Sequence, residues 1–97
     1  MVLKSGIPQK NADYVARNVG GEVILVPIRH RVEELDNVFV MRDVGAFVWE
    51  MIDGTTSVAG IAEKVVDTYD VSAEQAARDV DDLMTSLELE GIVSWRS

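Results

Sequence analysis

The hydrophobic pattern of the chain changes its period at Asp43. Before that residue, the apolar side chains form short continuous runs at residues 23–26 and 38–41, which are typical of strands. After it, they recur at three- and four-residue spacing, as on the buried stripe of an amphipathic helix. A run of strands followed by a run of helices indicates an α+β domain.

The part of the chain before Asp43 predicts a three-stranded antiparallel sheet. Strand-like residues 14–19 and 22–26 flank Gly20 and Gly21, and two glycines supply the positive φ angles of a tight hairpin turn. Residues 38–41 form the third strand. Because a long polar loop precedes this strand, we expect it at an edge of the sheet.

The part after Asp43 predicts three helices, at residues 44–52, 58–69 and 73–90. Ser57 and Ser72 are expected to be N-caps of the second and third helix, and Gln75 to complete a capping box with Ser72. Gly91 ends the third helix. Residues 92–95 then form either a last short strand or an extended tail.

Four residues of the helical region carry individual expectations. Phe47 and Tyr69 lie on the inward stripes of their helices and are assigned to the core. Trp49 lies beside the stripe of its helix, so we expect it to be partly exposed and available to a partner. Gly60 weakens the second helix and is expected where another backbone passes closely.

A three-stranded sheet attached to three helices with short turns is a winged helix-turn-helix-like arrangement. The 97 residues suffice for one domain, so residues 1–97 are expected to form a single unit, with residues 1–13 as an extended N-terminal arm. Many winged helices bind DNA, which makes a DNA-binding regulator the first alternative to consider.

The charge distribution disfavours nucleic acid. The net charge is −8, and residues 43–97 hold twelve of the 17 acidic residues but three of the nine basic ones. The third helix, which would enter the major groove, carries six acidic side chains against Arg78 alone. Affinity for DNA comes mainly from neutralising phosphates, so this helix would repel it.

The residues needed for catalysis are also missing. The chain has no cysteine, and its one histidine, His30, lies in a charged loop with nothing nearby to orient it as a base. Asp79, Asp81 and Asp82 do not converge on a cation from one helix. We therefore expect a non-enzymatic protein without metal or cofactor. A secretory signal and a long apolar run are both lacking, which suggests the cytoplasm.

The two apolar runs leave one question open. Every residue in them is apolar, whereas three short helices cover one face of a sheet. The other face needs the N-terminal arm, a second copy of the chain or a bound partner. The third strand is either an unpaired edge, ready for strand addition, or a core strand with the tail or hairpin alongside.

Residues 41–54, MRDVGAFVWEMIDG, resemble the pattern L-N-x-x-[GA]-A-x-x-[WL]-x-L-[LI]-D-G of the PqqD-like family. Residues 57–62, 69–71 and 87–93 are similar to its T-V-x-x-I-A, Y-x-V and L-x-x-x-G-hydrophobic positions. Arg42 stands where the family usually has Asn, so Asp43 is expected to cap the first helix instead.

The resemblance implies a non-catalytic module that recognises ribosomally made precursor peptides. The leader segment of the precursor would add as a strand to the third strand, with side chains in a groove against the third helix. Its partners would be the leader peptide and a maturation enzyme, often a radical S-adenosylmethionine enzyme, as in pyrroloquinoline quinone biosynthesis. A homodimer through the apolar sheet is another alternative. The implied peptide-binding residues are Val38, Phe39, Val40, Met41, Arg78, Val80, Asp81, Leu83, Met84 and Leu87.

Overall fold

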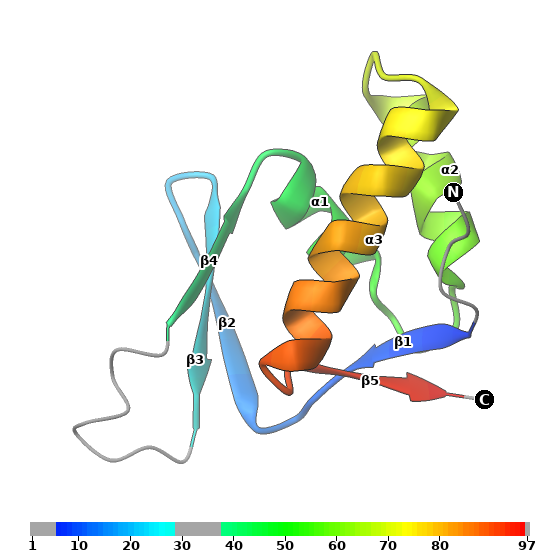
Figure 1. Ribbon diagram of the computed structural model, residues 1–97. Coiled ribbons are helices and arrows are strands. Elements are labelled where there is room, and N and C mark those ends of the chain that lie inside the picture. Colours follow the sequence, from blue (N-terminus) through cyan, green and yellow to red (C-terminus); the bar gives the residue numbers. More distant parts are fainter. Residues whose placement is uncertain (1–5, 29–37, 97) are drawn as a thin grey trace.

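The computed structural model of the chain describes residues 6–28 and 38–96 (Figure 1). The expected loop at residues 28–37, with His30, falls almost entirely outside these residues. In chain order the elements are β1 (Ile7–Lys10), β2 (Tyr14–Val19), β3 (Glu22–Pro27), β4 (Phe39–Arg42), α1 (Val44–Met51), α2 (Val58–Thr68), α3 (Ala73–Leu89) and β5 (Val93–Arg96). The three predicted strands and three predicted helices are confirmed.

Strands β2, β3 and β4 form an antiparallel sheet in that order. Gly20 and Gly21 connect β2 to β3 with φ angles of 55° and 85°, so the predicted tight hairpin turn is confirmed. Among the described residues, β4 pairs with β3 alone and so lies at the edge of the sheet, which is the first of the two positions that the sequence left open.

The two ends of the described chain form a second sheet. Strand β1 pairs antiparallel with β5, from Ile7 opposite Arg96 to Lys10 opposite Val93. Part of the expected N-terminal arm is thus a strand, and the C-terminal segment is a strand rather than a loose tail. Because β5 pairs with β1, it does not cover the edge of β4.

The core lies between the β2–β3–β4 sheet and the helices (Figure 1). Within β3, Val23 and Leu25 are buried while Ile24 and Val26 are only half-buried, so alternate residues face the helices. Phe47 and Tyr69 pack against this core with their rings edge to face, 5.4 Å apart, as expected. Although every residue of the run 23–26 is apolar, β3 therefore has one buried face and one partly exposed face.

The prediction of a side-chain N-cap is confirmed for α2 and α3 and is wrong for α1. Ser57 Oγ accepts from the Gly60 amide at 3.1 Å, and Ser72 Oγ accepts from the Gln75 amide at 3.0 Å. The capping box is only half formed, because Gln75 Nε2 donates to Asp79 Oδ1 instead. Asp43 precedes α1, but its side chain makes no capping hydrogen bond and its φ is 53°.

Two expectations about packing are wrong. Trp49 is only 4% exposed and belongs to the core, and the Lys10 ammonium of β1 lies over its ring, 4.5 Å from the centroid. Gly60 is not crowded by a passing backbone. A Cβ added there would lie 3.1 Å from Thr56 Cγ2 and 3.4 Å from Ser57 Oγ, so its own N-terminal turn limits the space.

The free edge of β4 and the adjoining flank of α3

The backbone register decides which polar groups β4 presents. A two-residue turn makes Val19 and Glu22 a hydrogen-bonded pair, so Glu22 and every second residue after it bond toward β2. The intervening residues of β3 bond toward β4, opposite Phe39 and Met41. Val40 therefore directs its N–H and C=O away from β3. No strand within residues 6–28 and 38–96 pairs with these groups, which makes them a template for strand addition.

The side chains at residues 38–41 point to both faces of the sheet. Met41 is buried at 4% exposure and Phe39 packs half-buried against the core. Val38 and Val40 are 40% and 46% exposed on the opposite face. A strand added beside β4 would thus have apolar neighbours above and below.

Gly45 marks the point where β4, α1 and α3 come together. A Cβ added at Gly45 would lie 3.5 Å from Met41 Cβ and 4.0 Å from Leu83 Cδ2. These are ordinary van der Waals distances, so Leu83 of α3 packs next to the start of α1, where α1 follows the end of β4. Leu83 is half-buried at this junction, so part of it stays accessible beside the edge.

The other expected residues of α3 lie in different places. Three of them are fully buried and pack α3 against the core: Val80, Met84 and Leu87. Arg78 is exposed, and its Nη1 donates to Gln75 Oε1 at 3.4 Å. Asp81 shares a flank with Glu88, whose carboxylate accepts from Trp95 Nε1 of β5 at 2.9 Å. Whether these five residues contact a peptide stays a prediction.

Residues that share the flank of Leu83 follow from helical spacing. Asp79 lies four residues before Leu83 and Ser86 three residues after it, so both are on the side that faces β4. Neither is among the residues expected from the sequence. Their three- and four-residue spacing from Leu83 could have pointed to them, but the contact between Leu83 and Gly45 is known only from the structure.

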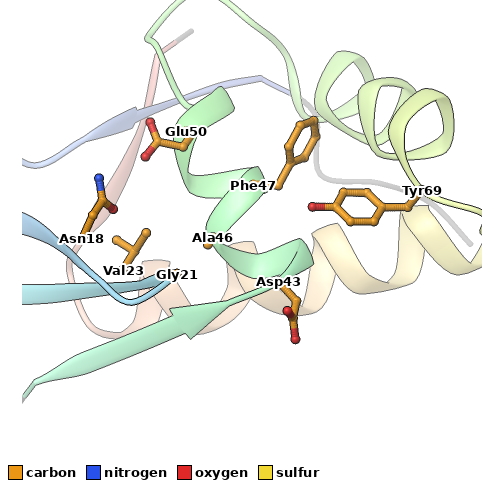
Figure 2. Close-up of a pocket in the computed structure, with 8 residues that line it drawn as sticks. All are labelled: Asn18, Gly21, Val23, Asp43, Ala46, Phe47, Glu50 and Tyr69. Atoms are coloured by element: carbon orange, nitrogen blue, oxygen red, sulfur yellow. The ribbon is translucent and has the colours of Figure 1, made fainter.

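A hollow in the described part of the structure lies elsewhere. It has a volume of about 480 Å³ and opens between the β2–β3 hairpin tip, α1 and the end of α2. Figure 2 shows its lining residues: Asn18, Gly21, Val23, Asp43, Ala46, Phe47, Glu50 and Tyr69. The carboxylates of Asp43 and Glu50 point in different directions, so they form no paired acid–base site (Figure 2).

The described residues also provide no metal centre. Among them, no three His, Cys, Asp or Glu side chains gather in a way that would hold an ion. None of their helices is both long and apolar enough to cross a membrane.

Three comparisons with known proteins bear on this site. The sequence profile of the family described as coenzyme PQQ synthesis protein D (PqqD) matches residues 22–93. A structure of TbiB1 in complex with the TbiA(beta) leader peptide is similar, with a TM-score of 0.76 and 17% identity over 92% of this chain and 98% of that chain.

A structure of a lasso peptide synthetase B1 complexed with the leader peptide is also similar. Its TM-score is 0.70 at 19% identity, over 90% of this chain and 96% of that chain. No curated protein matches the sequence. The two structures confirm the predicted α+β, winged helix-turn-helix-like fold.

Proposed function

The chain belongs to the PqqD family, and from this we propose that it binds the leader segment of a ribosomally made precursor peptide and presents it to a modifying enzyme. The observation that carries the proposal is the unpaired edge of β4 beside the flank of α3. The leader peptides named with both similar structures support the same ligand class.

The backbone of β4 supplies the first part of the binding energy. The N–H and C=O of Val40 would bond to the main chain of the leader, which tolerates varied leader sequences. Ordering a flexible leader costs about 2–5 kcal/mol, so we expect micromolar affinity.

The flank of α3 supplies selectivity. We assign the side-chain contact first to Leu83, with Asp79 and Ser86 on either side of it. Val80, Met84 and Leu87 would act indirectly, by holding the helix in place. Asp79 adds negative charge next to an apolar contact, so the favoured leader carries an aliphatic residue close to Lys or Arg.

The module would be non-catalytic and would work with a separate enzyme. The family resemblance implies a radical S-adenosylmethionine enzyme, with pyrroloquinoline quinone or another peptide-derived compound as the product, and we expect this handover in the cytoplasm. The homodimer expected from the apolar sheet is a separate proposal, because leader binding does not need it. No observation favours the DNA-binding alternative.

A titration with the synthetic leader encoded beside this chain tests the proposal. Amide signals of residues 38–41 and of the Leu83 flank should shift, and a scrambled leader should shift neither. Leu83→Ala should weaken binding at least about fivefold, while Arg78→Ala, on the far side of α3, should change it less than about twofold. Equal effects of the two substitutions would contradict the assignment to Leu83, and a leader that shifts no signal would refute the proposed function.

A further inference from the structure

Arg42 is the last residue of β4, and its side chain lies beside the edge of the sheet that is open to strand addition. Alternate residues of a strand share a face, so Arg42 lies with Val40 on the face opposite the buried Met41. In the register, Arg42 is opposite Glu22 of β3. Arg42 Nη2 and Glu22 Oε2 form an ion pair at 2.8 Å on this outer face. A guanidinium is thus held next to the open edge.

The guanidinium of Arg42 has donors that Glu22 does not use. It carries several N–H groups, and the pair with Glu22 is the one ion pair that Arg42 makes within residues 6–28 and 38–96. Glu22 lies on the β3 side of Arg42, whose side chain is 67% exposed. The other side of Arg42 faces the position of an added strand.

The backbone register brings an added strand to Arg42 as well as to Val40. Both residues are opposite β3 residues that bond toward β2, so both direct their N–H and C=O away from β3. A leader that bonds to these groups would set one side chain beside Val40. The next side chain on the same face would lie beside Arg42. Directly paired Cβ atoms are about 4.5–5.5 Å apart, which is within reach of an ion pair.

We propose that Arg42 selects leaders with an Asp or Glu two positions from the aliphatic residue that lies beside Val40. The inference rests on the proposed function and names one side chain of its ligand. The leader carboxylate would accept hydrogen bonds from the N–H groups of Arg42 that Glu22 leaves unused. An aliphatic neighbour is favoured beside Val40, which is 46% exposed.

Glu22 does not cancel this selection. Neighbouring strands are about 4.8 Å apart, so the leader carboxylate would lie one strand spacing from Arg42 and two, or about 10 Å, from Glu22. Two exposed charges at the larger distance are largely screened at physiological ionic strength, where the Debye length is about 8 Å. The attraction to Arg42 therefore exceeds the repulsion from Glu22.

The other charges around Arg42 leave the contact open. Asp43 follows Arg42 in the chain and makes no ion pair with it among the described residues. Arg17 lies on the same face but on β2, and Asp13 precedes β2 at the end of the sheet away from Arg42. Asp79 is on α3, which covers the opposite face. A bound leader can therefore direct a basic side chain toward α3 and an acidic one away from it.

Anisotropy titrations with the labelled leader encoded beside this chain test the inference. Copies of the leader carry a single Asp→Asn or Glu→Gln change. Arg42→Gln should weaken binding of the unchanged leader about two- to fivefold. One amide copy should bind the wild type more weakly by a similar factor and lose nothing further with Arg42→Gln. Arg17→Gln is the matched control on the same face, two strands from the edge, and should change binding less than about 1.5-fold.

A reversal of charge gives a second test. Arg42→Glu should weaken binding of the unchanged leader at least about fivefold, and a leader with Lys at the identified position should recover it. The double variant Arg42→Gln, Glu22→Gln separates the contact from repulsion by the freed Glu22 carboxylate, and the loss seen with Arg42→Gln should remain in it. Thermal unfolding should stay near that of the wild type, because a surface ion pair contributes little to stability.

The outcomes separate this inference from the proposed function. A wild-type protein that binds no leader would refute both. Leader binding with equal affinity for the wild type and Arg42→Gln would overturn the inference alone. So would a bound leader segment without Asp or Glu, or wild-type affinity in the double variant.

Discussion

The hydroxyl of Tyr14 donates to the carbonyl oxygen of Glu90 at 3.1 Å and so ties the first strand of the sheet to the C-terminal end of α3. The last carbonyls of a helix have no partner within the helix, so a donor from outside stabilises its end. Asn11 also bonds next to the C-terminal end of α3, since its Nδ2 donates to the Gly91 carbonyl at 2.8 Å. The C-terminal end of α3 is therefore tied both to the first residue of β2 and to the segment before it.

Replacing Tyr14 by Phe should lower the free energy of unfolding by about 0.5–1 kcal/mol, because one exposed hydrogen bond is lost while the ring is kept. Urea unfolding measures this change. Tyr69→Phe is the matched control: the Tyr69 hydroxyl makes no hydrogen bond to any group within residues 6–28 and 38–96, so we expect almost no change. Equal losses in the two variants would contradict a specific role for the bond to Glu90.

Asp43→Gly should stabilise the protein. Asp43 has φ 53° and ψ −124°, a region that costs a residue with a Cβ about 1–3 kcal/mol. Glycine removes the strain but adds flexibility to the unfolded chain, so we expect a net gain of about 1 kcal/mol. Thermal or urea unfolding measures it.

Asp43→Ala separates this strain from the carboxylate. Since the Asp43 side chain makes no capping bond, its removal alone should bring no gain. A stabilisation by alanine equal to that by glycine would show that relief of backbone strain is not the cause.

Asp53 should make stability depend on acid pH. The amides and hydroxyls of Thr55 and Thr56 donate to its carboxylate and lower its pKa from 3.8 to about 2. A folded-state pKa below the unfolded one means that this contribution is complete above about pH 4 and is lost as pH falls toward 2.

Asp53→Asn tests this pH dependence. Unfolding by urea at pH 5 and pH 3 should show a smaller loss of stability on acidification in the variant than in the wild type. Glu50→Gln serves as the control for removing a nearby exposed carboxylate. The same loss in Asp53→Asn and wild type would show that the threonine donors do not favour the ionised form.

Val40→Pro should abolish leader binding. Proline removes the N–H that points outward from the β4 edge and bends the strand. Val40→Ala keeps that N–H and should bind within about threefold of the wild type. Fluorescence anisotropy with a labelled leader measures both, and an amide spectrum checks that each variant is folded. Normal binding by the proline variant would rule out strand addition at this position.

Local signals were sufficient to predict much of the fold. Gly20 and Gly21 were enough to predict the hairpin turn, because the positive φ angles that the turn needs belong to these two adjacent residues. Ser57 and Ser72 gave two helix starts, because each hydroxyl bonds to an amide three residues away. The sequence left the position of β4 open between an edge and a core strand, because the long polar loop before it favours an edge while its uniformly apolar residues also fit a core strand.

Contacts between distant segments were harder to predict. Lys10, far away in the sequence, lies over the ring of Trp49, and the pairing of β1 with β5 joins the two ends of the described chain. For the candidate site, peptide contact at residues 38–41 and along α3 stays a prediction, and the residues expected on α3 lie on more than one side of the helix. Helical periodicity separates buried from exposed residues, yet only Gly45 shows which flank approaches β4.

The pairing of β1 with β5 has a practical consequence for assays. Figure 1 shows this two-strand ribbon on the opposite side of the molecule from β4. An affinity handle fused to the C-terminal end of the ribbon would therefore anchor the protein to a biosensor chip with the β4 side of the molecule turned toward the flowing sample.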